Sequence, residues 1–250
     1  MAKEHGGEHL SPVVVITGAA SGIGRRTVMR FTEAGWRVIA VDRQIESLQR
    51  ENLRDVEIYE LDVSEELQVA EWAQRIELHH LNIVALVNSA GIGLFATRLE
   101  DISLVDWNRV VATNLTGPFL MTRALLPALK AHGGCIVNIS SVHAMSTTFG
   151  MAAYASTKAA LIGLTRATAV DYRSCHVRAN CLLVGSVDTP MSDQHRDAIM
   201  KNHAPDPGID PHLMASPTQI ANVIYFLCTN ESQFVNGTAL RVDGGLLSEL

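Results

Sequence analysis

The feature that most constrains this chain is a regular alternation of short apolar runs and longer helical segments over its 250 residues. The apolar runs are rich in valine and isoleucine and nearly continuous, which indicates strands buried on both faces of a parallel sheet. We expect these strands at residues 13–16, 36–41, 56–61, 83–87, 136–139, 177–182 and 239–242.

Helical segments fill most of the intervals between the strands. The first follows a glycine-rich turn and ends near residue 34, where Gly35 can terminate it. Ser64 is placed to cap a helix whose first turn contains Glu65 and Glu66. We expect further helices at residues 104–113, 116–130, 152–172 and 217–229. Repeated strand–helix units without a linker predict an α/β fold, a doubly wound parallel sheet of about seven strands with helices on both faces, in one domain over residues 12–250.

Two segments depart from this alternation. Residues 1–11 are polar and lack the apolar stretch of a signal peptide, so we expect a flexible N-terminal tail. Residues 186–216 are polar and rich in proline, and they contain His195, His203 and His212. A long stretch of weak pattern in a compact fold predicts a substrate lid, with a mobile loop as the alternative. The three histidines are either solvated or contacts for a charged substrate group.

Composition excludes several classes of protein. The net charge of −6 argues against a nucleic-acid-binding face, and no apolar run reaches the ~18 residues of a membrane span. The four cysteines show no CxxC spacing, so we expect buried free thiols in a reducing cytoplasm and no metal site.

The sequence TGAASGIG at residues 17–24 follows a strand and opens a helix. Gly18 permits a sharp turn, Gly22 permits close approach of a pyrophosphate, and Gly24 permits tight packing of helix on strand. The helix N-terminus presents unpaired N–H groups to phosphates. The spacing is GxxxGxG rather than GxGxxG, and a tight structural turn is the alternative explanation.

Asp42 ends the second strand, where an acid accepts hydrogen bonds from both hydroxyls of an adenine ribose. A carboxylate there repels a 2′-phosphate, so NAD is favoured over NADP as the cofactor. Arg43 follows directly and either reaches a 2′-phosphate or lies on the adenine. An aspartate that only caps the next loop is the structural alternative.

Two further strand ends carry residues suited to a cofactor: Asp62 and Val63 after the third strand, and the small-residue sequence NSAG at 88–91 after the fourth. Ordinary turn chemistry explains each of them equally well in isolation. The cofactor contacts expected from the first four strand ends are Gly18, Ser21, Gly22, Ile23, Gly24, Asp42, Arg43, Asp62, Val63, Asn88, Ala90 and Gly91.

Tyr154 and Lys158 are four residues apart on a predicted helix and therefore share one face. A tyrosine acts as a base near neutral pH only if its pKa falls, and a nearby ammonium favours the phenolate. Ser141 follows a strand and can hold a substrate oxygen, whereas the adjacent Ser140 must point the other way. In isolation, such a Tyr–Lys pair is more often a core ring beside a solvated charge.

Asn114 lies in a helical run, which it is expected to disturb, and it either holds a water or is a surface residue. His143 lies two residues after Ser141 and is expected to face the substrate cleft, either as a ligand for a polar or anionic group or as a plain wall residue. Phe149 indicates a partly apolar pocket, and Gly185 is a further candidate substrate contact.

Together these motifs resemble the short, single-domain branch of the short-chain dehydrogenase/reductase family, with its Rossmann-type fold, over nearly the whole chain. The matches come in family order: TGAASGIG (17–24), Asp42, Asp62-Val63, NSAG (88–91), Asn114, the set Ser141, Tyr154 and Lys158, the segment 185–189, and VDGG (242–245). Two positions depart from the pattern, since Ser89 replaces an asparagine and Val184 replaces a proline.

The resemblance implies roles for these residues. Tyr154 is the general acid/base, Lys158 lowers its pKa and binds the nicotinamide ribose, and Ser141 orients the substrate oxygen. Asn114 supports a water relay, while Val187 and Thr189 contact the nicotinamide carboxamide. It also implies a homo-oligomer, most often a tetramer.

Three functions remain open. The first is an NAD-dependent dehydrogenase that transfers a hydride between a secondary alcohol or ketone and the cofactor. The second is an NADPH-dependent carbonyl reductase, against which Asp42 argues. The third is a cofactor-binding regulator without turnover, against which the intact Ser141, Tyr154 and Lys158 set argues.

Overall fold

The computed structural model describes residues 11–77, 82–205, 208 and 211–248. Its centre is a seven-stranded sheet in the order β3-β2-β1-β4-β5-β6-β7, and every neighbouring pair is parallel. The strands are β1 (Val13–Thr17), β2 (Arg37–Asp42), β3 (Val56–Glu60), β4 (Ile83–Asn88), β5 (Cys135–Ser141), β6 (Arg178–Val184) and β7 (Ala239–Val242). The predicted doubly wound parallel sheet is confirmed, while the expected tail at 1–11 lies outside the described residues except for Ser11.

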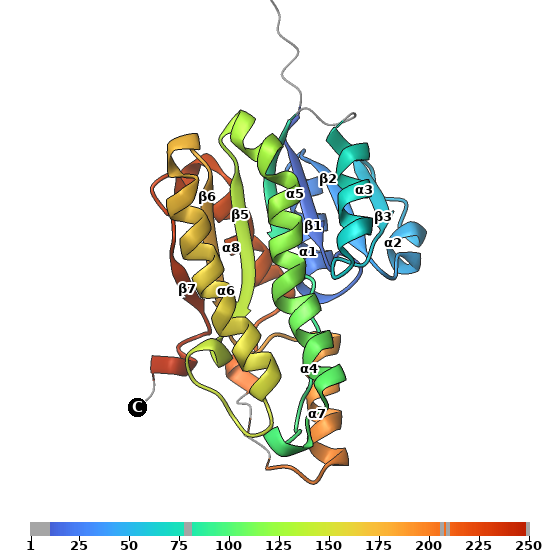
Figure 1. Ribbon diagram of the computed structural model, residues 1–250, viewed down its shortest axis with the longest axis vertical. Helices are drawn as coiled ribbons and strands as arrows, with labels where there is room; N and C mark the ends of the chain where they lie inside the picture. The colour runs from blue at the N-terminus through green and yellow to red at the C-terminus, as the bar shows by residue number, and fades with distance from the viewer. Residues whose placement is uncertain (1–10, 78–81, 206–207, 209–210, 249–250) are drawn as a thin grey trace, which may run out of the picture.

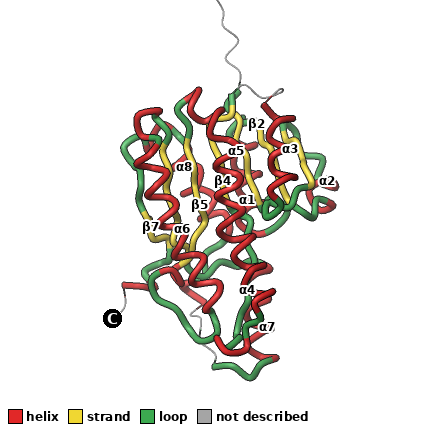
Figure 2. The backbone as a smooth tube through the Cα atoms, in the orientation of Figure 1, coloured by secondary structure: helices red, strands yellow, loops and turns green. Residues whose placement is uncertain are grey.

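Helices cover both faces of the sheet (Figures 1 and 2). They are α1 (Gly22–Glu33), α2 (Glu46–Arg50), α3 (Glu66–Glu77), α4 (Leu104–Val111), α5 (Gly117–His132), α6 (Ala152–Asp171), α7 (Pro190–Lys201) and α8 (Pro217–Cys228). One core cluster joins the sheet to α3, α5 and α6, and a second joins it to α1, α2 and α8. None of the helices in the described residues is long and apolar enough to cross a membrane.

The strands have a side-chain period of two, and both sets of side chains are buried. In β1, Val13 and Val15 belong to one core cluster, whereas Val14 and Ile16 belong to the other. A strand buried on both faces needs apolar residues at every position, which explains the continuous runs in the sequence. The strand order reverses between β1 and β4, so the connections that leave their carboxyl ends run to opposite faces of the sheet, which favours a crevice there.

Two local predictions need correction. Ser64 does not cap α3, because its hydroxyl donates to the Asp62 carboxylate at 2.6 Å and the helix begins at Glu66. The segment 186–216 is not irregular throughout, because it contains the 12-residue helix α7. None of the residues of α7 is fully buried, so the helix lacks the apolar stripe that would reveal it in the sequence. Figure 1 shows α7 beyond the carboxyl ends of the strands.

Candidate active site

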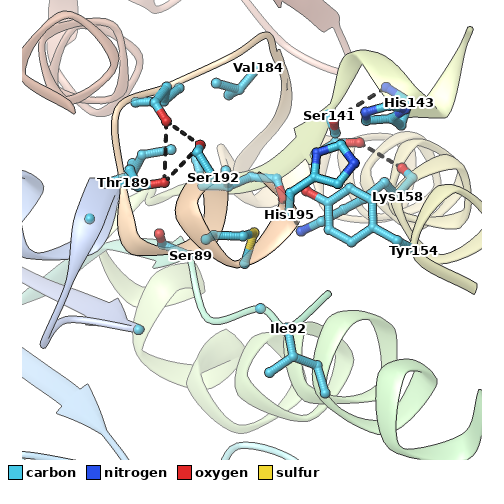
Figure 3. A pocket seen from close by; sticks show the side chains of 18 of the residues that line it. Ser89, Ile92, Ser141, His143, Tyr154, Lys158, Val184, Thr189, Ser192 and His195 are labelled. Carbon is cyan, nitrogen blue, oxygen red and sulfur yellow. Dashed lines mark hydrogen bonds between the residues drawn. The ribbon is translucent and has the colours of Figure 1, made fainter. Parts of the chain in front are cut away.

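A cavity of about 780 Å³ lies at the carboxyl ends of the strands. Its wall runs from the glycine-rich turn after β1, through the ends of β2 and β3, to the end of β5, the first turns of α6 and the helix α7. The cavity therefore has one end near Asp42, called the nucleotide end after the cofactor contacts expected there, and one near Tyr154, called the substrate end. Figure 3 shows the region around Tyr154. Of the predicted site residues, all but Asn88, Asn114 and Phe149 line this cavity.

At the nucleotide end, the glycine-rich turn presents the free N-terminus of α1. Ser21 is the N-cap residue of α1, but its side chain makes no capping hydrogen bond, and the first turn of the helix holds no acidic residue. Gly18 has a φ of +65°, and a Cβ there would lie 2.7 Å from backbone atoms of Ala90. A Cβ on Gly24 would lie 2.0 Å from the carbonyl oxygen of Gly18. Positions 18 and 24 of the turn therefore have room only for glycine. The free amides and the dipole at the start of α1 suit an anionic group such as a diphosphate.

Asp42 fixes the turn to the end of β2. Its Oδ2 accepts a hydrogen bond from Ala20 N at 2.9 Å, and its Oδ1 accepts one from Gln44 N at 3.0 Å. The carboxylate thus has the loop-capping function considered as the structural alternative. It also lines the cavity beside Arg43, and its remaining lone pairs can accept hydroxyl donors.

The middle of the cavity is bounded by the turn after β4. Thr17 Oγ1 accepts hydrogen bonds from the amides of Ser89 and Ala90, both at 3.1 Å, which holds this turn against β1. Asn88 points away from the cavity into the core, where its amide donates to Asn138 Oδ1 at 2.8 Å. Asn88 therefore supports the turn without contacting the cavity.

At the substrate end, α6 supplies Tyr154 and Lys158, and the end of β5 supplies Ser141. The Ser141 hydroxyl acts on Tyr154 in the direction that lowers the pKa of the phenol. Lys158 Nζ donates to the carbonyl oxygen of Ile139 at 2.8 Å and lies 5.5 Å from the centre of the Tyr154 ring. Ser140 points elsewhere, as predicted, and donates to the carbonyl of Lys158 at 2.7 Å. These bonds fix α6 against β5 and bring the three predicted catalytic side chains together.

Burial dominates the protonation of this group. It raises the pKa of Tyr154 to about 12, against the smaller opposing effect of the Ser141 hydroxyl. It also lowers the pKa of Lys158 to about 8. Desolvation therefore sets the direction of the Tyr154 pKa shift in the chain alone, where Lys158 Nζ is bound to the Ile139 carbonyl, and the lowering of that pKa by Lys158 stays a prediction. The phenol is held in its protonated form.

Asn114 disturbs its helix, as predicted. It lies in a π-helical turn, Ala112–Thr116, between α4 and α5. Its Oδ1 accepts from Ile92 N and its Nδ2 donates to Ile92 O, both at 2.8 Å, and Nδ2 also contacts Thr157 Oγ1 at 3.3 Å. The fully buried amide thus clamps the segment after β4 to α6. Its side chain positions the cavity wall and does not reach the cavity.

The substrate end contains residues that the sequence reasoning missed. Phe95, Met151 and Tyr154 form a small apolar cluster, against which Met191 packs. Phe95 and Met191 line the cavity from segments far apart in the sequence, and no local motif marks either of them. Phe149, by contrast, lies outside the cavity wall, half exposed beneath the Arg98 guanidinium.

Comparison with known proteins identifies the family. A family model described as enoyl-(acyl carrier protein) reductase matches residues 18–247. The chain is 34% identical to the 3-oxoacyl-[acyl-carrier-protein] reductase FabG of Thermotoga maritima, over 94% of this chain and 97% of that protein. It is also 34% identical to the cyclopentanol dehydrogenase of Comamonas testosteroni, over 93% of this chain and 96% of that protein.

Solved structures show the same fold with nicotinamide cofactors. ElxO with NADP bound superimposes with a TM-score of 0.85 at 29% identity, covering 96% of this chain and 100% of that one. The 3-ketoacyl-(acyl-carrier-protein) reductase from Brucella melitensis complexed with NADH gives a TM-score of 0.82 at 29% identity, covering 94% of this chain and 97% of that one. With its parallel sheet, its glycine-rich turn and these relatives, the chain belongs to the short-chain dehydrogenase/reductase family of oxidoreductases.

Proposed function

We propose that this protein is an NAD-dependent dehydrogenase that interconverts a secondary alcohol and its ketone. The observation that carries the proposal is the single cavity that joins the Asp42 carboxylate at one end to Ser141, Tyr154 and Lys158 at the other. A dinucleotide needs an anion site, a ribose site and a reacting end in one continuous groove, and the chain supplies residues for all three.

The residues present fit the cofactor. The uncapped amides at the start of α1 suit the diphosphate, and Asp42 suits the hydroxyls of the adenine ribose. Asp62 and Val63 would flank the adenine, Lys158 would bind the nicotinamide ribose, and Val187 and Thr189 would hold the carboxamide. When bound, the nicotinamide accepts a hydride from the alcohol carbon or returns it to the ketone.

The side chains at the reacting end move the proton. Ser141 donates a hydrogen bond to the substrate oxygen and holds it beside the Tyr154 hydroxyl. In ketone reduction Tyr154 Oη gives its proton to that oxygen; in alcohol oxidation the phenolate takes the proton from it. Lys158 stabilises the phenolate, because its ammonium lies 5.5 Å from the centre of the Tyr154 ring.

A second candidate is an NADPH-dependent carbonyl reductase. Arg43 lines the cavity directly beside Asp42 and offers a cation to a 2′-phosphate. The protonated phenol of Tyr154 also suits the reductive direction. The Asp42 carboxylate opposes a 2′-phosphate at the same place, so NAD is favoured.

The test is NADH formation from NAD⁺, with NADP⁺ in parallel, over a panel of secondary alcohols, polyols and hydroxy acids. The proposal predicts reduction of NAD⁺ with at least one alcohol and a lower kcat/KM with NADP⁺. Activity with NADP⁺ alone would support the reductase, and silence with both would leave a binding protein, which an NADH titration detects. The homotetrameric state stays a prediction from the family resemblance, and the cytoplasmic location stays a prediction from the cysteines.

A further inference from the structure

Two histidines face the substrate end from separate elements. His143 lies in the short 3-10 turn after β5, and His195 lies on α7 (Figure 3). The centre of the His143 ring lies 6.1 Å from the centre of the Tyr154 ring, and the two rings meet edge to face. The centre of the His195 ring lies 4.8 Å from the centre of the Phe95 ring, whose centre lies 5.8 Å from that of the Tyr154 ring. His143 therefore lies next to the Tyr154 ring, His195 lies on the far side of Phe95 from it in the chain of ring contacts, and both histidines line the cavity.

Two hydrogen bonds fix His143 in place, one from its backbone N–H and one at its Nδ1. Its backbone N–H donates to Ser141 Oγ at 3.2 Å, and its Nδ1 pairs with Thr147 Oγ1 at 3.2 Å. Its Nε2 has no hydrogen-bond partner among the residues that the structure describes. Burial, with a smaller contribution from His195, lowers the pKa of His143 to about 4, so the ring is neutral at pH 7. A neutral imidazole offers a hydrogen bond but no charge.

The described residues place few ionic charges near these imidazoles. Apart from the histidines, the ionisable side chains among the described cavity-lining residues are Asp42, Arg43, Asp62, Tyr154 and Lys158. The first three belong to the nucleotide end. Lys158 is buried and its Nζ is bound to the Ile139 carbonyl. The surrounding wall at the substrate end, from Phe95, Met151 and Met191, is apolar. Because His143 is neutral, an anionic substrate group here would lose its water with only His195 to offset its charge.

We propose that His143 and His195 recognise an uncharged oxygen substituent adjacent to the reacting carbon, so that the substrate class is a neutral vicinal diol and its α-hydroxy ketone. This inference rests on the proposed dehydrogenase function. One substrate oxygen lies between Ser141 and Tyr154, where the proton is exchanged. A second oxygen, one carbon further on, reaches the imidazoles beside the phenol. His143 and His195 are thus specificity-determining residues that leave the proton transfer to Tyr154.

The test uses three four-carbon substrates that differ in one substituent: 2-butanol, 2,3-butanediol and 3-hydroxybutyrate. With NAD⁺, kcat/KM is expected to be highest for the diol, at least about tenfold above 2-butanol, because the polar site strongly favours the partner that completes its hydrogen bonds. Equal values for the diol and 2-butanol would overturn the inference while leaving the dehydrogenase in place. A preference for 3-hydroxybutyrate would overturn the claim of a neutral site. No NADH from any secondary alcohol in the wider panel would overturn the proposed function itself, and the inference with it.

Variants of His143 and His195 test whether the two imidazoles cause the preference for the diol over 2-butanol. His143→Phe and His195→Phe are each expected to lower the diol-to-2-butanol ratio of kcat/KM by about three- to tenfold, the effect of one lost hydrogen bond. His195→Gln, which keeps a polar end, should restore part of the ratio. His132→Phe, at an exposed position at the end of α5, is the matched control and should keep the wild-type ratio. A ratio that survives both Phe substitutions would contradict the assignment, whatever their effect on stability.

Discussion

Lys158 Nζ donates a hydrogen bond to the carbonyl oxygen of Ile139 at 2.8 Å while it lies 5.5 Å from the centre of the Tyr154 ring. The Lys158 ammonium thus lies near the Tyr154 ring while its hydrogen bond goes to Ile139. Burial of Tyr154 raises its pKa and keeps the proton on the phenol oxygen. In the proposed mechanism, proton exchange with the substrate depends on this one hydroxyl.

Tyr154→Phe should reduce turnover by at least about a hundredfold, the usual contribution of a positioned acid or base, because it removes only the transferable proton. The ring and its contact with Phe95 are retained. NADH binding, followed by fluorescence titration, should stay within about twofold of the wild type, since the change leaves the cofactor's charged contacts in place. A variant that keeps most of its rate would show that another group carries the proton.

Asp42→Asn should shift the cofactor preference towards NADP by about tenfold or more in the ratio of kcat/KM values, because it removes the charge that repels a 2′-phosphate. The amide oxygen can still accept from one of the two backbone donors, Ala20 N and Gln44 N, while the NH2 group cannot accept from the other, so the turn should keep one of its two side-chain bonds. Asp42→Ala removes both acceptors and is expected to weaken the binding of both cofactors. An unchanged preference in Asp42→Asn would mean that the carboxylate serves only the loop.

Gly24→Ala should abolish cofactor binding and destabilise the fold, since its Cβ would meet the Gly18 carbonyl at 2.0 Å. The matched control is Gly163→Ala, on the exposed face of α6 with nothing within 4 Å of the new Cβ. That control should raise the free energy of unfolding by about 0.5–1 kcal/mol, since alanine is the better helix former. Urea unfolding and NADH titration of both variants check the pair.

Asn114→Ala should lower the free energy of unfolding by about 1–3 kcal/mol, because the N–H and C=O of Ile92 lose their partner in a buried place. Activity should fall as well, since the segment after β4 forms part of the cavity wall. Asn108→Ala, at an exposed position on α4, is the control and should change neither quantity appreciably. Wild-type stability in Asn114→Ala would contradict the clamping role.

His143 should contribute a pH dependence to stability. Its pKa is lowered from 6.5 to about 4 on folding, so between these values the unfolded chain binds a proton that the folded chain does not. Stability due to this residue is therefore full above pH 6.5 and falls as the pH drops towards 4. His143→Gln should flatten the Tm-against-pH curve over that window relative to the wild type, and an unchanged slope would show that the ring is not buried in its neutral form.

The sequence predicts most of the fold because the sheet is buried on both faces. Strands such as Val13–Thr17 are then continuously apolar, and their short length separates them from helices. The helix α7 lacks that signal, since its residues are at most partly buried, and it is placed by its contacts and not by periodicity. The first turn of α3 is shifted because Ser64 bonds to Asp62 instead of capping the helix.

The predicted site divides in the same way. Residues that belong to a local motif, such as Gly18 or Tyr154, line the cavity as expected. Residues placed by tertiary packing do not reveal themselves: Phe95 and Met191 meet only in the fold, and Asn88 and Asn114 turn out to support the walls of the cavity. The sequence also does not predict the protonation state of Tyr154, because the burial that raises its pKa is a property of the folded chain.

The most direct test of hydride transfer follows the substrate hydrogen itself. The best secondary alcohol of the panel, carrying deuterium on its carbinol carbon, is incubated with NAD⁺ and the protein, and the reduced cofactor is analysed by mass spectrometry. We predict that one deuterium appears in the reduced cofactor with the wild type and that Tyr154→Phe forms almost none. Reduced cofactor without deuterium, or undiminished transfer in the variant, would contradict the assignment of hydride transfer with Tyr154 as the acid/base.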